Sequence, residues 1–133
     1  MEEILNFLTA NHTFYFATVD GDKPKVRPLG FFMNFEGKLY FGIGKHKQSY
    51  RQIKVNPYVE ICTASLEGQW IRINGKVAFD ERPETLEKAF ATMPLLKDMY
   101  NEKTGQKLGL FYLEEATAEL ADMTGNFKKI ALS

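Results

Sequence analysis

The sequence predicts a mainly β protein, a small antiparallel barrel with helices around it. Two observations carry this prediction. Apolar, β-branched and aromatic residues gather in six short runs, and aromatic residues make up 14% of the chain. Most of these runs are joined by short turns rich in Gly, Asp and Pro, which is typical of neighbouring antiparallel strands. A chain of 133 residues is long enough for one domain, and we expect residues 1–133 to form it.

The first half of the chain is predicted to form a helix, three strands and a second helix. In chain order these elements are 2–8 (EEILNFL), 13–19 (TFYFATV), 25–35 (KVRPLGFFMNF), 38–43 (KLYFGI) and 48–55 (QSYRQIKV). The helices follow from apolar residues three or four positions apart, and the strands from dense aromatic and β-branched residues. Tight turns over 20–24 and 36–38 separate the strands, and Asn56-Pro57 ends the second helix.

The second half is predicted to add three strands and one interrupted helix, giving six strands and three helices in total. In chain order these elements are 58–65 (YVEICTAS), 70–79 (WIRINGKVAF), 82–93 (RPETLEKAFATM) and 108–123 (LGLFYLEEATAELADM). Gly75 in mid-strand predicts a bulge, and we expect the last strand to bend near Glu114 and Glu115. Pro83 suits the first turn of the helix, whereas Pro94 interrupts it before a further turn.

Composition excludes several classes of protein. The single cysteine, Cys62, cannot form an internal disulfide, and a lone thiol fits a reducing compartment. No apolar run approaches the roughly 20 residues that span a bilayer, and the N-terminal MEEILNFLTA lacks the basic region of a signal peptide. His12 and His46, the only histidines, have no Cys or acidic residue at ligand spacing, so no metal site is expected. We therefore expect a cytoplasmic protein without a membrane partner.

The charges of the chain are segregated, although seventeen basic and seventeen acidic residues give a net charge of zero. Residues 37–59 contain five Lys or Arg and no acid, whereas residues 80–122 contain ten acids and five bases. An anionic ligand is therefore expected to bind the first half. Basic runs are also found on solvated helix faces, and this alternative stays open.

The basic segment 42–57 (GIGKHKQSYRQIKVNP) matches no glycine-rich phosphate motif. Its Gly44-Lys45 lacks the upstream Gly and the following Ser or Thr of a P-loop, and Lys47 takes the third glycine position of a dinucleotide fingerprint. What remains is a strand end, a basic loop and a helix start, where backbone N–H groups are unpaired. We therefore predict a phosphate site at Lys47, Gln48 and Ser49.

Two neighbouring strands carry positions that are unsuited to an ordinary ladder. Pro28 has no N–H to donate, and Gly30 has no side chain to pack. Gly42 repeats this feature on the next strand. Such bare positions beside a phosphate turn are suited to a flat aromatic ring that carries a phosphate tail.

Three segments together, FATVDGDKPKVRPLGFF, LYFGIGKHKQSYRQIKVNPYVEIC and WIRINGKVAF, resemble the pyridoxamine 5'-phosphate oxidase-like family of FMN-binding split barrels. The resemblance covers about residues 1–122. It implies a six-stranded antiparallel split barrel of Greek-key type, and a homodimer with FMN in a cleft between the subunits.

The resemblance also implies three groups of FMN contacts. They are a strand that lines the ring (Arg27, Pro28, Leu29, Gly30), a strand that offers backbone contacts (Phe41, Gly42, Ile43) and a turn that holds the phosphate (Lys47, Gln48, Ser49). The family turn usually has an Arg or Lys at or just before the position of Ser49. This chain has Gln48 and Ser49 there, with the lysine one place earlier.

No catalytic side chain is predicted. Cys62 is expected to be a buried core thiol, and the adjacent Glu114 and Glu115 are expected to point to opposite faces of a strand. Trp70 has a core-packing explanation, but in a dimer it would be able to stack on the partner's flavin. A flavoprotein needs no such group, because the cofactor supplies the electron chemistry.

The resemblance therefore implies a small FMN-dependent oxidoreductase. It would pass electrons from a reduced nicotinamide or another donor to a small acceptor such as a nitro compound or a quinone. A flavin-storage or redox-sensing protein without turnover is the first alternative. A binder of single-stranded nucleic acid ranks last, because the basic residues cluster in a turn and a helix while most aromatic residues lie in strands. We thus expect no nucleic-acid partner.

Overall fold

The computed structural model describes residues 1–132. Its helices are α1 (Glu2–Ala10), α2 (Gln48–Val55), α3 (Pro83–Thr92) and α4 (Leu95–Met99). Its strands are β1 (Phe14–Asp20), β2 (Lys23–Leu29), β3 (Phe32–Phe35), β4 (Lys38–Gly44), β5 (Tyr58–Ala64), β6 (Gln69–Phe79), β7 (Leu108–Asp122) and β8 (Phe127–Ala131). Every strand pairing is antiparallel, so the predicted mainly β fold with flanking helices is confirmed.

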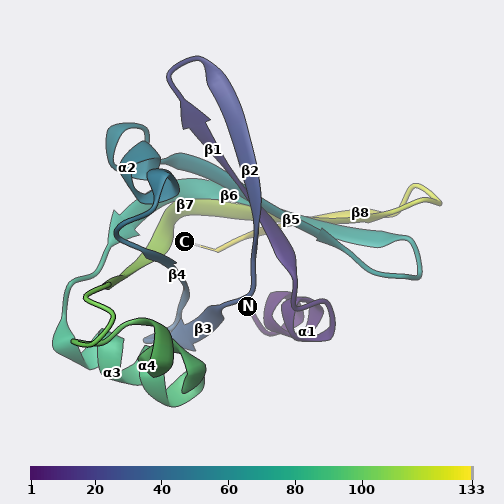
Figure 1. Cartoon of the computed structure of the whole chain (residues 1–133). Coiled ribbons are helices and arrows are strands. Elements are labelled where there is room, and N and C mark those ends of the chain that lie inside the picture. Colours follow the sequence, from purple (N-terminus) through teal and green to yellow (C-terminus); the bar gives the residue numbers. More distant parts are fainter. Residues whose placement is uncertain (133) are drawn as a thin grey trace.

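The strands form one strongly curled sheet (Figure 1). Its order is β2-β1-β5-β6-β7-β4-β3, with β8 added along β7. β2 and β3 lie at opposite ends of this order, although only Gly30 and Phe31 separate them in the chain. The step from Leu29 to Phe32 can cover at most about 11 Å. The two edges of the sheet must therefore meet at this point, which closes one end of a barrel.

Within residues 1–132 there are eight strands where the sequence predicted six. The predicted strand 25–35 is in fact two, because the chain leaves one sheet edge after Leu29 and joins the opposite edge at Phe32. Pro28 is tolerated because β2 is an edge strand that pairs only with β1. β8 was not predicted; it pairs only with β7 and is mostly exposed, so its sequence lacks an apolar alternation. The helix that Pro94 interrupts is two helices, α3 and α4.

The predicted bulge lies between β6 and β7, but the extra residue is on β7. Gly75 stands between the pairs Asn74–Thr117 and Lys76–Glu114, so it faces two residues, Glu115 and Ala116. Glu115 has a φ of 52°, and this bend in β7 was expected. A Cβ at Gly75 would lie 2.9 Å from the Cβ of Leu113, so only glycine fits. Glu114 and Glu115 are both exposed at this bulge.

The barrel encloses the main core. Phe16, Ile61, Ile73 and Ala118 pair in one row across four strands, and each is completely buried. Burying a large apolar side chain contributes about 1.5–3 kcal/mol, so such rows fix the register of the sheet. A second cluster lies outside the barrel, where α3 and α4 cover Phe31, Tyr40, Leu108 and Leu110. The sheet is thus covered on part of its outer surface by helices (Figure 1).

Within residues 1–132, none of the helices is both long enough and apolar enough to cross a membrane.

Candidate functional site

The barrel is open between β2 and β4, and α2 packs beside this opening. β3 pairs with β4 only as far as the Phe32–Phe41 pair, so within residues 1–132 the backbone of 42–44 has no strand partner on that side. The other edge of the opening is β2, which pairs only with β1. α2 contacts both β1 and β4. We call this opening, together with the first turn of α2, the basic split.

Arg27 reaches from β2 to α2. Its Nη1 donates hydrogen bonds to Thr18 Oγ1 at 2.7 Å and to the carbonyl of Phe16 at 3.2 Å. Its Nη2 donates to Gln52 Oε1 at 2.9 Å. Thr18 Oγ1 donates to the same Gln52 oxygen at 2.6 Å. This network ties β1, β2 and α2 together and fixes the guanidinium in the basic split.

All the acceptors that hold Arg27 are neutral. Within the described part of the chain, no carboxylate lies within ion-pair distance of its guanidinium. The side chain is half-buried, and burial lowers the pKa of Arg27. A partly desolvated cation without a counter-ion is unfavourable until an anion is supplied. Arg27 is therefore suited to an anionic ligand.

The first turn of α2 is open to an acceptor. Lys47 is the N-cap in an extended conformation (φ −81°, ψ 154°), and no side chain caps the helix. The N–H groups of Gln48 and Ser49 have no acceptor within residues 1–132. Lys47 and Gln48 are exposed, whereas Ser49 is buried. Free N–H groups and the positive end of the helix dipole favour a phosphate here.

Strand β2, the N-cap of α2 and helix α2 itself carry several cations that have no carboxylate partner within residues 1–132. These are Lys25, Arg27, Lys47, Arg51 and Lys54. The basic segment contains no acid of its own, but Glu81 forms an ion pair with Lys45 at 2.7 Å. This contact could not be predicted from the sequence, because 36 positions separate the two residues. Lys45 is thus neutralised, and Lys47 is not.

A groove of about 690 Å³ runs along α2 on the side of the β1–β2 turn. Gln48, Arg51 and Gln52 line it from the helix, and Asp20 lines it from β1. The polar face of α2 therefore opens on solvent-accessible space rather than on the core.

The other residues predicted for the flavin ring lie along the edges of the basic split. Pro28 and Gly30 are exposed on the β2 side, and Leu29 is half-buried. Phe41 and Ile43 on β4 are 0% and 2% exposed, so their side chains belong to the core and only their backbone is available.

Gly42 differs from the bare position that the sequence suggested. A Cβ at Gly42 would lie 3.1 Å from Leu108 Cδ1, 3.1 Å from Leu110 Cδ2 and 3.4 Å from Phe31 Cδ2. Neighbouring side chains therefore already cover this face of β4.

Trp70 does not lie near the basic split of its own chain. It is at the start of β6, and Phe79 at the other end of β6 packs against Tyr50 of α2, with ring centroids 5.3 Å apart. Phe79 lies nine residue steps along the strand from Trp70, which is roughly 30 Å. Trp70 can meet a ligand in this split only from a second copy of the chain.

Sequence reasoning missed two residues of the Arg27 network, Thr18 and Gln52. Thr18 is 2% exposed and follows Phe14 and Phe16 on the inward face of β1, so a hydroxyl interrupting an apolar alternation was the available signal. Gln52 lies four positions after Gln48, which puts both amides on one face of α2.

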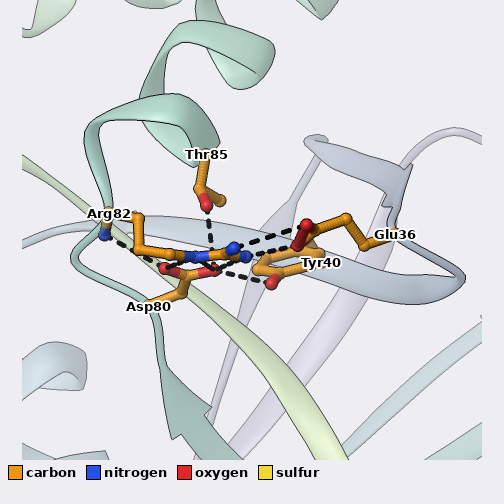
Figure 2. Close-up of polar contacts among 5 residues, drawn as sticks. All are labelled: Glu36, Tyr40, Asp80, Arg82 and Thr85. Carbon is orange, nitrogen blue, oxygen red and sulfur yellow. Dashed lines mark hydrogen bonds and ion pairs between the residues drawn. The ribbon is translucent and has the colours of Figure 1, made fainter.

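A second polar cluster joins the start of α3 to β4 and the β3–β4 turn (Figure 2). Asp80 accepts hydrogen bonds from the Tyr40 hydroxyl (2.6 Å), the Thr85 hydroxyl (2.9 Å) and Arg82 Nη2 (2.9 Å). Arg82 also pairs with Glu36. The Asp80 side chain is only 6% exposed. We call these five residues the Asp80 clamp.

The Asp80 clamp holds its groups far from the pKa of a catalytic acid or base. Hydrogen bonds from Arg82, Tyr40 and Thr85 keep the pKa of Asp80 well below its usual value. Burial and the bond to Asp80 raise the pKa of Tyr40 to about 12. Efficient general acid–base catalysis needs a pKa near the working pH. The clamp is therefore a structural connection between α3 and the sheet.

The chain matches one protein family over most of its length. Residues 1–124 match the model of the pyridoxamine 5'-phosphate oxidase family. No curated protein sequence matches significantly.

Several solved structures share the fold. A NimC/NimA family protein from Clostridium acetobutylicum is 37% identical, with a TM-score of 0.90 over 98% of this chain and 91% of that chain. An FMN-binding protein related to pyridoxamine 5'-phosphate oxidase, from Nostoc punctiforme, is 17% identical, with a TM-score of 0.67 over 99% and 96% of the two chains. A heme-binding protein from Mycobacterium smegmatis is 11% identical, with a TM-score of 0.70 over 93% of this chain and 54% of that chain. At such low identity, the last two support the fold alone.

Proposed function

Because the chain belongs to the pyridoxamine 5'-phosphate oxidase family, we propose that it binds FMN in the basic split. One observation carries this proposal: a half-buried arginine is hydrogen-bonded to α2, the start of α2 is uncapped, and within residues 1–132 no carboxylate forms an ion pair with Arg27 or Lys47. A phosphate carries roughly −1.5 to −2 charges at pH 7 and would supply the missing anion. The Nostoc punctiforme neighbour, whose name says that it binds FMN, agrees with this ligand.

The residues of the split fit the parts of FMN. Lys47 and the N–H groups of Gln48 and Ser49 would hold the phosphate. Arg27 would hold an anionic or carbonyl oxygen of the cofactor, and the unpaired backbone edge of 42–44 would contact the ring. The extended segment Pro28–Gly30 would lie along the ring on the other side.

We further propose that the protein is an oxidoreductase acting on a small molecule. Bound FMN would supply the electron chemistry, and the protein would bind and orient it and exclude water. This agrees with a site that offers cations and backbone donors and no acid–base pair. A protein that stores flavin or senses redox state without turnover would use the same contacts.

The ligand site is proposed to be completed in a homodimer. Exposed apolar side chains lie on three neighbouring strands, with Tyr15 on β1, Val26 on β2 and Tyr58 on β5 being 50%, 67% and 60% exposed. Exposed apolar side chains on neighbouring strands suit an isologous interface. The interface would allow Trp70 to reach the partner's split. Sedimentation should then give a species of twice the 15.3 kDa chain mass.

A comparison of FMN with riboflavin, which has the ring but no phosphate, tests the proposed site. Wild type should bind FMN much more tightly. The double variant Lys47→Ala, Ser49→Ala should lose most of this preference, roughly ten- to a hundredfold for one charge-assisted bond, while its riboflavin affinity stays the same. Lys97→Ala, which removes the same charge from exposed α4, is the control and should behave as wild type. Equal affinities for the two flavins in wild type would show that the basic segment is only a solvated helix face.

A further inference from the structure

A second cavity lies on the other side of Lys45, away from the first turn of α2. It has a volume of about 370 Å³, and it is bordered by α3, the loop 100–107, Lys45 and the start of β7. Its apolar wall consists of Leu86, Phe90, Leu108 and Leu110. This volume is within the range of small-molecule sites, and it leaves room for about a dozen non-hydrogen atoms. We call it the α3 pocket.

Tyr100 gives the α3 pocket a polar anchor. The residue is only 8% exposed, and its hydroxyl has no hydrogen-bond partner within residues 1–132. Burial raises the pKa of Tyr100, so the phenol stays protonated and remains a donor at neutral pH. The hydroxyl oxygen itself is not sealed from solvent, so it is free to donate a hydrogen bond to a ligand acceptor in place of water.

The absence of a side chain at Gly44 keeps this hydroxyl accessible. A Cβ at Gly44 would lie 3.2 Å from the Tyr100 oxygen and 2.5 Å from His46 Cε1. Any larger residue at position 44 would therefore crowd both rings. The chain thus places an unpartnered donor directly beside the loop that leads to the basic split.

The rim of the α3 pocket is electrically balanced. Lys45 is paired with Glu81, and Arg82 is held by Asp80 and Glu36. The two remaining charged residues of the rim, Lys107 and Glu102, have opposite signs. An ion of either sign gains little here, whereas a neutral apolar molecule gains from the wall. This pocket differs in this respect from the basic split, where Arg27 and Lys47 have no carboxylate partner within residues 1–132.

We propose that the α3 pocket binds a neutral, planar ring that carries a carbonyl acceptor, as quinones do. The ring lies against Phe90 and Leu110, and the carbonyl oxygen accepts a hydrogen bond from Tyr100. Leu108 and Leu110 also cover Gly42, so this ligand lies on the far side of these side chains from the β4 backbone edge. The site forms without FMN, and it does not depend on the proposed flavin function.

The test uses duroquinone, tetramethyl-1,4-benzoquinone, as the probe. This molecule is neutral and planar, has about a dozen non-hydrogen atoms, and has no free ring position that the thiol of Cys62 can attack. It is titrated into flavin-free, ¹⁵N-labelled protein while amide chemical shifts are recorded. We expect saturable shifts that centre on Phe90, Tyr100 and Leu108.

Two variants separate the pocket from other surfaces. Tyr100→Phe keeps the ring and removes the donor, so it should weaken binding about three- to tenfold. Leu86→Trp should fill the pocket and abolish saturation. Tyr112→Phe is the matched control, because Tyr112 lies on β7 outside this pocket, and it should bind as wild type. Dispersed amide spectra identify the variants that have folded.

Three results would overturn the proposal: no saturation up to the solubility of the probe, shifts centred on α2 or the outer sheet face, or a folded Tyr100→Phe variant with unchanged affinity. Repeating the titration with FMN present keeps this test apart from the flavin proposal. If FMN does not bind, the flavin-free titration still tests whether the α3 pocket binds duroquinone.

Discussion

Two polar regions of this molecule use similar groups in opposite ways. In the Asp80 clamp, Arg82 faces two carboxylates, and Asp80 accepts hydrogen bonds from three side chains. In the basic split, Arg27 has only neutral acceptors, and the start of α2 has free N–H groups. The charges of the clamp are paired with one another, whereas within residues 1–132 no carboxylate is paired with Arg27 of the split.

This difference teaches how to tell a structural cluster from a binding site. In a structural ion pair, each group stabilises the charged form of the other within the folded chain. The pKa of the acid is therefore lowered and that of the base is raised. A binding site keeps a polar group unsatisfied until its ligand arrives, at some cost in stability. Removing a clamp residue should therefore reduce stability, and removing a split residue should reduce ligand affinity.

The largest effect is expected for Asp80→Ala. This change leaves the buried Tyr40 and Thr85 hydroxyls without an acceptor and Arg82 without its nearest counter-ion. We expect a loss of about 3 kcal/mol in the free energy of unfolding, measured by urea denaturation. The FMN dissociation constant of the folded fraction should stay unchanged. The exposed Asp22→Ala is the control, and a similar loss there would contradict a special role for the clamp.

The next effect is expected for Arg27→Ala. Loss of a charge-assisted bond should weaken FMN binding roughly ten- to a hundredfold, measured by fluorescence titration. Stability should change little, because only neutral partners lose a donor. Arg82→Ala is the reciprocal control: it should lower stability and leave the affinity for FMN unchanged. If both arginine variants lower the same quantity, the distinction between clamp and split is wrong.

The smallest effect is the pH dependence of stability that titration of Asp80 causes. Its pKa is held below the ordinary value of 3.8, first by Arg82 and then by Tyr40 and Thr85. The carboxylate therefore stabilises the fold fully above about pH 4, and this contribution is lost as the pH falls through the lower, folded pKa. Urea midpoints of wild type should decrease below pH 4 more steeply than those of Asp80→Asn. Parallel curves for the two proteins would show that Asp80 titrates normally.

Much of the fold follows from local pattern. The aromatic and β-branched runs and the turn residues between them indicated the strands, and Asn56-Pro57 marked the end of α2. The strand 25–35 was misread because an apolar run does not reveal that its two halves pair with opposite edges of one sheet. β8 was missed because a strand that pairs on one side only and is mostly exposed has no apolar alternation.

The sequence by itself determined the parts of the candidate site that lie within a few residues of one another. Lys47, Gln48 and Ser49 form the start of α2 because a strand end, a loop and a helix follow each other directly. Backbone N–H groups at a helix start are free whatever the rest of the chain does, which is why a phosphate turn could be predicted.

Only the tertiary structure decided which distant residues meet. The contact of Arg27 with Gln52 spans 25 positions, that of Lys45 with Glu81 spans 36, and that of Tyr40 with Asp80 spans 40. Whether these contacts form depends on strand register and on the meeting of the two sheet edges at Gly30 and Phe31. Closure of the sheet is set by burial of the whole core, so no local pattern shows that one lysine is neutralised and its neighbour two positions later is not.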